Sequence, residues 1–312
     1  MINFRYHVVS ITSVFLALAI GLVLGTAALN GPVANDLNSR VTDLRAANNQ
    51  LRGQVSDLDK QVQGRDEFVK QVAPTLLANQ LTGKRVLLVA LPGASDANQQ
   101  GVRDMLGFAG ASVTGTLGFT ADFVDPTRSD DSLDLATRLT PPGVAALPTN
   151  NDGVQTASAL FGRLFAAGKA NVTDAARTAL VAGFDGLKFV QASSPVGPAD
   201  AVVFVAGTPL TGRDADRRNT NVHMLVSQLA ASFDSAVLAA PTAAGDGNVV
   251  AAVRGDDALA TRVSTVDTAG SAEGQLAAVM ATAERFGGKA GHYGAGDGAT
   301  APVPTLPKTA QK

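Results

Sequence analysis

The fold of this chain is constrained most by an uncharged apolar run near its start, Val8–Leu29. An α-helix rises about 1.5 Å per residue, so a run of this length spans the roughly 30 Å hydrocarbon core of a bilayer. Its polar side chains are all hydroxyls. The sequence therefore predicts a single-pass membrane anchor which, with a short cytoplasmic N-terminal tail, occupies residues 1–30.

The same run has to be weighed against a cleaved signal peptide. Signal peptides have apolar cores of about 7–15 residues, shorter than this run, so we favour a retained anchor over cleavage after Ala28 or Ala34. Arg5 precedes the run and predicts a cytoplasmic N-terminus, although Arg40 and Arg45 follow it and oppose that orientation. In the favoured orientation the bulk of the chain is extracytoplasmic and belongs to the cell envelope.

A second pattern follows a predicted break at Asn30, Gly31 and Pro32. Apolar residues recur alternately four and three positions apart, which is the heptad spacing of a coiled coil. The d positions are Leu37, Leu44, Leu51 and Leu58, and the a positions are Val41, Asn48, Val55 and Val62. We therefore expect a coiled-coil stalk over residues 34–73, stopped or kinked by Pro74.

The residue types in this seam favour a parallel homodimer. Valine at a with leucine at d favours two strands, and a single asparagine at a, here Asn48, fixes register and oligomeric state. Gly21 and Gly25 form a G-x-x-x-G step that lets two helices approach closely in lipid. Two chains anchored in one membrane emerge in parallel, so anchor and stalk favour the same dimer. The alternative is one amphipathic helix that packs on its own domain.

Short apolar runs alternate with helical patterns from Gly83 onward. The runs are Val86–Leu91, Ala201–Ala206, Ala236–Ala240 and Val249–Val253, with further strands expected at 112–117, 187–192 and 263–267. Helices are expected at 96–109, 155–168, 173–184, 219–233 and 271–286. Continuous apolar runs are typical of strands buried on both faces of a parallel sheet. We predict a doubly wound, mostly parallel α/β domain over residues 83–288 and a disordered tail over 289–312.

Composition and motifs exclude several kinds of chemistry. The net charge of −2 gives no electrostatic basis for binding nucleic acid. The absence of cysteine excludes disulfides, thiolate zinc sites and a cysteine nucleophile. Turns at Leu91–Gly93 and Gly207–Gly212 follow predicted strands but match no phosphate-binding motif. No serine elbow accompanies the three histidines, so we expect no catalytic or cofactor-binding residue, and no enzyme.

The sequence also offers little for a copper site. Cu(I) prefers thiolate and thioether ligands, and the chain has four methionines. His223 and Met224 are adjacent, and adjacent residues do not share a helical face. We therefore assign no metal-binding residue.

The N-terminal block Phe4–Gly25, the heptads, the glycine-rich α/β region and the late Gly291-His292-Tyr293-Gly294 together resemble one family, the actinobacterial MctB family. The resemblance implies copper transport or homeostasis across the envelope, with outer-membrane association described for the family. SteB-type proteins, similar to the same family, act in septation. For these the resemblance implies a SteA-type partner and a coiled-coil peptidoglycan hydrolase.

The residues do not favour these two implied functions equally. A membrane β-barrel needs strands of alternating polarity, about ten residues long, flanked by aromatic girdles. Here the predicted strands are uniformly apolar, tryptophan is absent and there are two tyrosines. The residues alone therefore favour an anchored interaction protein, whereas the resemblance favours copper transport, and an envelope enzyme is the third alternative.

Overall fold

The computed structural model describes residues 4–169, 172–193 and 195–305, without the side chains of 27–34. The chain divides into two compact units, Met1–Gly64 and Arg65–Lys312. This division differs from the predicted stalk, because residues 65–73 of the stalk belong to the same unit as the α/β domain. The two units are described separately.

One helix, α1, runs from Phe4 to Leu77. It continues through Asn30–Pro32, where we expected a break, and three residues beyond Pro74, where we expected a stop or kink. A proline inside a helix loses one hydrogen bond and costs about 3 kcal/mol. Ending the helix at Pro32 would leave up to four N–H and four C=O groups without partners. Strong helix-forming segments on both sides therefore override the proline.

The second unit is built on a seven-stranded sheet with the order β3-β2-β1-β4-β5-β6-β7. All neighbouring strands are parallel except β2 and β3, which confirms a mostly parallel sheet. The strands are β1 Arg85–Ala90, β2 Ser112–Phe119, β3 Val190–Ala192, β4 Ala201–Val205, β5 Ser235–Ala239, β6 Val263–Val266 and β7 His292–Tyr293.

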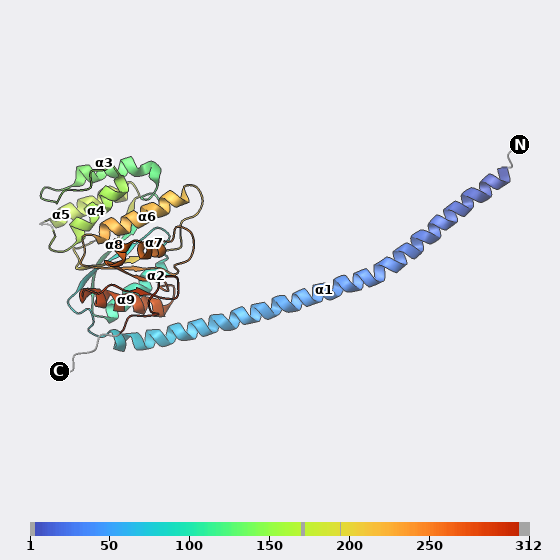
Figure 1. Ribbon diagram of the computed structural model, residues 1–312, viewed down its shortest axis with the longest axis horizontal. Helices are drawn as coiled ribbons and strands as arrows, with labels where there is room; N and C mark the ends of the chain where they lie inside the picture. The colour runs from blue at the N-terminus through green and yellow to red at the C-terminus, as the bar shows by residue number, and fades with distance from the viewer. Residues whose placement is uncertain (1–3, 170–171, 194, 306–312) are drawn as a thin grey trace. The chain divides into compact units, whose positions relative to one another are not determined.

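Helices cover both faces of the sheet, as expected for a doubly wound fold (Figure 1). One face carries the end of α1, α2 Asp96–Phe108 and α9 Ala272–Phe286. The other carries α3 Ser129–Leu139, α4 Gly153–Phe165, α5 Asp174–Gly186, α6 Ala215–Ala230, α7 Val249–Gly255 and α8 Asp257–Ala260. A 3-10 turn, η1 Pro126–Arg128, precedes α3.

The two faces of the sheet carry separate hydrophobic cores. Successive side chains of a strand point to opposite faces, so Leu87 and Val89 of β1 join one core while Val86 and Leu88 join the other. The core beneath α3–α8 is rich in phenylalanine, and the ring of Phe161 packs edge-on against two others. The core beneath α2 and α9 is aliphatic apart from Tyr293.

The structure corrects the predicted strand at Val249–Val253, which is the helix α7. Asn248 caps this helix, because its side-chain oxygen accepts hydrogen bonds from the backbone N–H groups of Val250 (2.9 Å) and Ala251 (3.3 Å). Val249, Val250 and Val253 are buried. A short apolar run fits a buried helix face as well as a buried strand, so only the cap distinguishes the two.

The structure also corrects the predicted disordered tail over the described residues 289–305. Strand β7 pairs with β6, and Tyr293 is 4% exposed. The chain then turns back, with Thr300 N donating to His292 O (2.7 Å) and Gly294 N donating to Ala301 O (3.0 Å). The Gly- and Ala-rich composition predicts disorder, yet side chains from α7 and β6 hold the segment in place. Residues 306–312 lie outside the described part.

Candidate functional site

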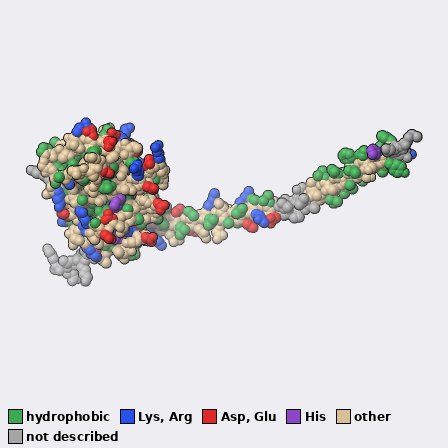
Figure 2. Space-filling model, turned by 45° about the horizontal axis from the view of Figure 1, so that its top comes forward, with side chains coloured by type: hydrophobic (Ala, Val, Ile, Leu, Met, Phe, Trp, Pro, Cys, Tyr) green, Lys and Arg blue, Asp and Glu red, His purple; other side chains and the backbone are tan. Residues whose placement is uncertain are grey.

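The apolar heptad positions of α1 lie at its surface in the single chain (Figure 2). The four leucines with Val55 and Val62 are between 51% (Val62) and 70% (Leu44) exposed. Val41 is half-buried, and Asn48 is exposed among them. A row of leucine and valine at alternating four- and three-residue spacing is the surface that a second helix covers in a coiled coil. This stripe is an apolar surface of α1 separate from its N-terminal run.

The N-terminal run lies in the same helix. By length and composition, Phe4–Thr26 is able to cross a membrane. Thr12 and Ser13 donate their hydroxyl hydrogens to carbonyls four residues earlier, both at 2.8 Å, and so need no outside partner. A Cβ added at Gly21 or Gly25 would meet nothing within 4 Å, so the G-x-x-x-G step is open to a neighbouring helix.

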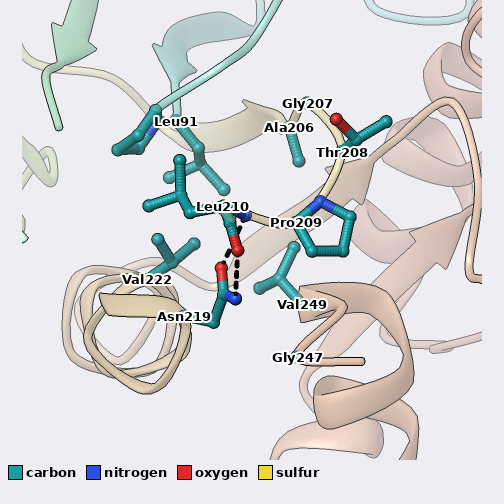
Figure 3. Close-up of a pocket in the computed structure, with 11 residues that line it drawn as sticks. Leu91, Ala206, Gly207, Thr208, Pro209, Leu210, Asn219, Val222, Gly247 and Val249 are labelled. Carbon is teal, nitrogen blue, oxygen red and sulfur yellow. Dashed lines mark hydrogen bonds between the residues drawn. The ribbon is translucent and has the colours of Figure 1, made fainter. Parts of the chain in front are cut away.

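The two glycine-containing turns singled out in the sequence come together at the carboxyl ends of β1 and β4 (Figure 3). In a doubly wound sheet this place, where strand order reverses, is the usual ligand crevice. Here the turns fill it: a Cβ on Gly207 would lie 2.1 Å from the backbone oxygen of Gly93. The remaining cavity has a volume of about 10 Å³, room for no more than a water molecule.

Asn219 of α6 fixes the second turn in this closed position. Its side-chain oxygen accepts from Leu210 N (2.9 Å), and its Nδ2 donates to Leu210 O (3.0 Å). Gly247 packs against the same side chain, where an added Cβ would lie 2.6 Å from Nδ2. The clamp makes the crevice a packed joint between α6 and the sheet.

His223 lies on α6 and faces Asp256, with 3.9 Å between its Nε2 and the nearer carboxylate oxygen. Burial lowers the pKa of His223, and the Asp256 charge partly offsets that effect. Met224 is half-buried, whereas Met105 and Met280 are buried in the aliphatic core. Within the described residues, no three His, Cys, Asp or Glu side chains lie close enough to hold a metal ion.

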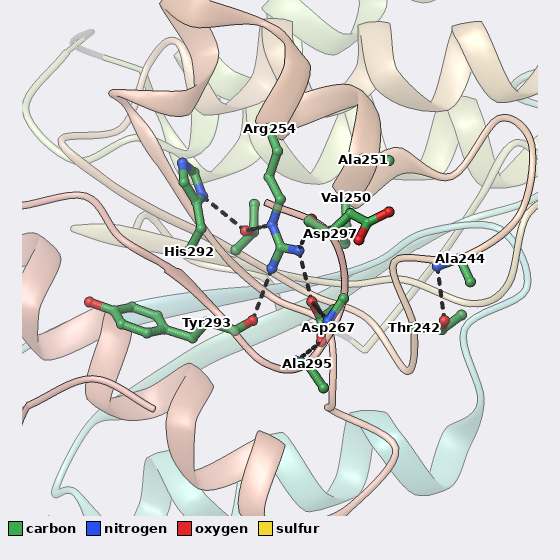
Figure 4. Close-up of polar contacts among 12 residues, drawn as sticks. Thr242, Ala244, Val250, Ala251, Arg254, Asp267, His292, Tyr293, Ala295 and Asp297 are labelled. Atoms are coloured by element: carbon green, nitrogen blue, oxygen red, sulfur yellow. Dashed lines mark hydrogen bonds and ion pairs between the residues drawn. The ribbon is translucent and has the colours of Figure 1, made fainter. Parts of the chain in front are cut away.

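A buried ion pair lies at the carboxyl end of β6 (Figure 4). Arg254 of α7 and Asp267 are 2.8 Å apart, and their side chains are 5% and 2% exposed. The Asp267 carboxylate also accepts from Ala295 N (2.8 Å) and Gly296 N (3.0 Å). Arg254 also donates to the backbone oxygens of Tyr293 (2.9 Å) and Asp297 (2.7 Å). The pair therefore ties segment 293–297 to the sheet.

This pair explains the Gly291-His292-Tyr293-Gly294 motif. Thr265 accepts from Arg254 Nε and lies 2.9 Å from Nδ1 of His292. The Tyr293 hydroxyl bonds Glu284, and burial with this bond raises the tyrosine pKa far above its usual value. Gly294 has φ +124°, and a Cβ there would lie 2.0 Å from the Asp267 carboxylate. The motif is a structural clamp in which His292 Nδ1 and the Tyr293 hydroxyl both contact side chains of the domain.

Comparison with known proteins places these features in a family. A family model described as copper transport outer membrane protein MctB matches residues 1–304. This chain belongs to the MctB family. Proteins named copper transporter MctB from Mycobacterium tuberculosis and Mycobacterium bovis are 30% identical to it over 96% of this chain and 98% of their own length. The protein of that name from Mycobacterium leprae is 31% identical over the same shares.

The MctB match covers apolar run, heptads, sheet and C-terminal clamp together. These relatives are named as transporters, and no enzyme family is indicated. Sequence reasoning singled out the heptad spacing and both turns but missed Arg254, Asp267 and Asn219. A single charge at the end of a predicted buried segment, as at Val249–Arg254 and 263–267, is the signal from which the buried pair could have been inferred.

Proposed function

We propose that this chain is a membrane-anchored, dimeric envelope protein that takes part in copper transport or homeostasis across the envelope. The observation that carries the proposal is the exposed heptad stripe from Leu37 to Val62, which follows an apolar run long enough to cross a membrane. Copper enters through the mycobacterial relatives, whose name is copper transporter MctB.

In this proposal the anchor only holds the protein in the membrane, and the stalk pairs two subunits. The run Val8–Leu29 has no charged or amide side chain, and such residues are what normally mark an ion path through a membrane. One such helix from each subunit dimerises through Gly21 and Gly25, and two subunits pair in parallel along the seam. The protein is single-pass with its α/β domain outside the cytoplasm. Outer-membrane association rests on the family description alone.

A second candidate function is a non-enzymatic scaffold for septation. It is favoured by the kind of surface that α1 presents, an apolar helical stripe of the sort that binds other helices. The partners it implies are a SteA-type protein and a coiled-coil envelope hydrolase. Both candidate functions need the dimer, and they differ in what the protein acts on: copper in the first function, and partner proteins in the second.

The test replaces residues 1–30 with an unrelated single-span anchor that also dimerises, in a strain lacking the native gene. We expect this variant to restore function, because the native helix only holds the protein in the membrane. Leu44→Asp with Leu51→Asp should abolish function and subunit crosslinking, because charge at d positions opens the seam. Leu44→Met with Leu51→Met is the matched control, because methionine keeps an apolar side chain without branching at Cβ at the d positions.

Copper tolerance and cell separation are measured for each variant. Copper tolerance restored by the swapped anchor supports the first function. Cell separation restored without copper tolerance would mean that both activities exist and that the native helix matters for copper. If the swapped anchor restores neither although the protein is present and dimeric, the holding role is wrong and a membrane-embedded mechanism replaces it. Unchanged crosslinking in the Leu44→Asp, Leu51→Asp variant would contradict the coiled coil itself.

A further inference from the structure

The heptad stripe of α1 does not stop at Val62. Counting in sevens from the a position Val62 gives Val69 and Leu76, and in the unit Arg65–Lys312 both are partly buried against the aliphatic core. Ala73 and Leu77, on the same side of the helix at four-residue spacing, are completely buried. From Val69 onward, the chain's own domain therefore covers the stripe that is exposed up to Val62.

Two further residues mark the change. Arg65 occupies the d position between Val62 and Val69, and two such arginines would repel each other across a paired seam. The next residue, Asp66, accepts a hydrogen bond at 2.9 Å from Ala272 N, the first residue of α9. A carboxylate at this place satisfies an unpaired N–H and the positive end of the α9 dipole. Asp66 is thus where α1 joins the domain.

We propose that pairing between two copies of this chain ends between Val62 and Val69, where the stripe passes from the partner helix to the chain's own domain. The proposal rests on the dimer proposed above. Paired helices pack with their axes about 8–10 Å apart, which leaves no room for another layer between them. A helix face whose Val69 and Leu76 pack against the aliphatic core of the domain therefore cannot also face a partner helix at that distance.

The consequence is that pairing and domain packing compete for one surface. Extending the coiled coil by another heptad would uncover Val69 and Leu76 from the aliphatic core, and keeping them there limits the coil to the Leu37–Val62 segment. The second copy is therefore the occupant of the stripe up to Val62, and the two α1 helices separate at Gly64 and Arg65.

Single cysteines test this directly, because the native chain has none. Leu51→Cys, Val62→Cys, Val69→Cys and Leu76→Cys are made separately in the full-length protein. Each is treated in membranes with the thiol oxidant diamide, and disulfide-linked dimers are quantified on denaturing gels. We expect strong dimer bands at 51 and 62 and at least tenfold weaker bands at 69 and 76. Leu76→Cys gives an independent result if Val69→Cys disturbs folding.

The outcomes separate the two proposals. Strong bands at 51 and 62 with weak ones at 69 and 76 support the end of pairing at this point. Equal bands at 62 and 69 would overturn it while leaving the dimer intact. Absence of bands at 51 and 62 would overturn the proposed dimer and with it this inference, provided that resistance to limited proteolysis shows the protein to be folded. Alkylation of the same Val69→Cys and Leu76→Cys proteins with N-ethylmaleimide is the control: thiols that react there but form few dimers show that weak crosslinking beyond residue 62 is not caused by burial.

Discussion

Arg254 and Asp267 show how two buried charges order a segment whose composition favours disorder. Removing an ion pair from water costs several kcal/mol per ion, and the cost is met only when further hydrogen bonds satisfy the remaining donors and acceptors. Here Asp267 accepts from two backbone N–H groups and Arg254 donates to two backbone oxygens. Each of these bonds reaches segment 293–297, so the charges stabilise the fold by fixing the C-terminal strand.

Arg254→Met should therefore destabilise the protein by about 3–5 kcal/mol, because it leaves the Asp267 carboxylate buried without a counter-charge. Asp267→Asn added to it should recover part of the loss, since the amide oxygen still accepts from Ala295 N and the charge is gone. Urea unfolding of the solubilised protein measures both variants. A loss below about 1 kcal/mol in Arg254→Met would show that the pair does not hold the segment.

His292 makes the same region sensitive to pH. Burial and the nearby Arg254 charge lower its pKa below 6.5, its ordinary value. The unfolded chain then binds the proton more readily than the folded one, so stability is complete above the unfolded pKa and falls as pH drops below it. His223, whose pKa is also lowered, contributes with the same sign.

We expect His292→Asn to reduce the loss of stability between about pH 7.5 and about pH 5, because asparagine does not titrate there. Asparagine also offers an oxygen acceptor for the Thr265 hydroxyl. The free energy of unfolding in urea at both pH values gives the measurement, and His223→Asn is the matched comparison for the other buried histidine. A pH dependence identical to that of the native chain would contradict the role of His292.

At the scale of elements, the sequence predicted strands correctly where an apolar run is continuous and has a turn at each end. Strands β1, β4 and β5 were predicted within a residue or two at either end, because each is a continuous apolar run between turns. The run at 249–253 was assigned wrongly, since its helical state depends on the Asn248 cap. Strand β7 was missed, since two residues held by the distant Arg254–Asp267 pair leave no local pattern.

The sequence also did not predict which helices pack together, because close packing depends on which small residues lie at the contact between two helices. Gly162 of α4 is one such place: an added Cβ would lie 2.8 Å from the backbone oxygen of Leu229 in α6. Alanine is the better helix former by about 1 kcal/mol, yet the backbone of α6 has nowhere to move. Close approach of the two helices therefore requires glycine here.

Gly162→Ala should destabilise the domain by about 1–3 kcal/mol through overpacking, despite the gain in helix propensity. Gly107→Ala is the matched control, because a Cβ on that helical glycine of α2 would meet nothing within 4 Å. It should leave stability unchanged or raise it by up to about 1 kcal/mol. Thermal unfolding of both variants is the measurement. Equal effects of the two substitutions would mean that α4 and α6 are not in such close contact.

At the scale of the whole molecule, the sequence predicted the elements of α1 better than their limits. The apolar run and the heptad spacing both predict helix, and both lie in the single helix α1. The spacing did not show that residues 65–73 of the predicted stalk pack with the domain, since Val69 and Leu76 continue the same spacing. Tertiary contacts decide whether a partner helix or the chain's own domain covers an apolar residue at an a position. The spacing of residues in the sequence gives no information on those contacts.

The last prediction concerns the membrane. Arg5 on one side of the apolar run predicts a cytoplasmic N-terminus, while Arg40 and Arg45 on the other side oppose it, so orientation is the part of the proposed function most in need of a direct test. A reporter that is active only outside the cytoplasm, fused after Lys312, should be active and should sediment with membranes after alkaline washing. The same reporter without residues 1–30 is the control and should be inactive.

Sequencing the N-terminus of the mature protein completes this test. We expect the mature chain to retain residues 1–30 and the reporter to be active in the membrane fraction, because the apolar run is longer than the core of a signal peptide. A mature chain beginning after Ala28 or Ala34 would contradict the anchor. Two subunits would then no longer be held parallel by one membrane, and the seam from Leu37 to Val62 would have to specify the dimer alone.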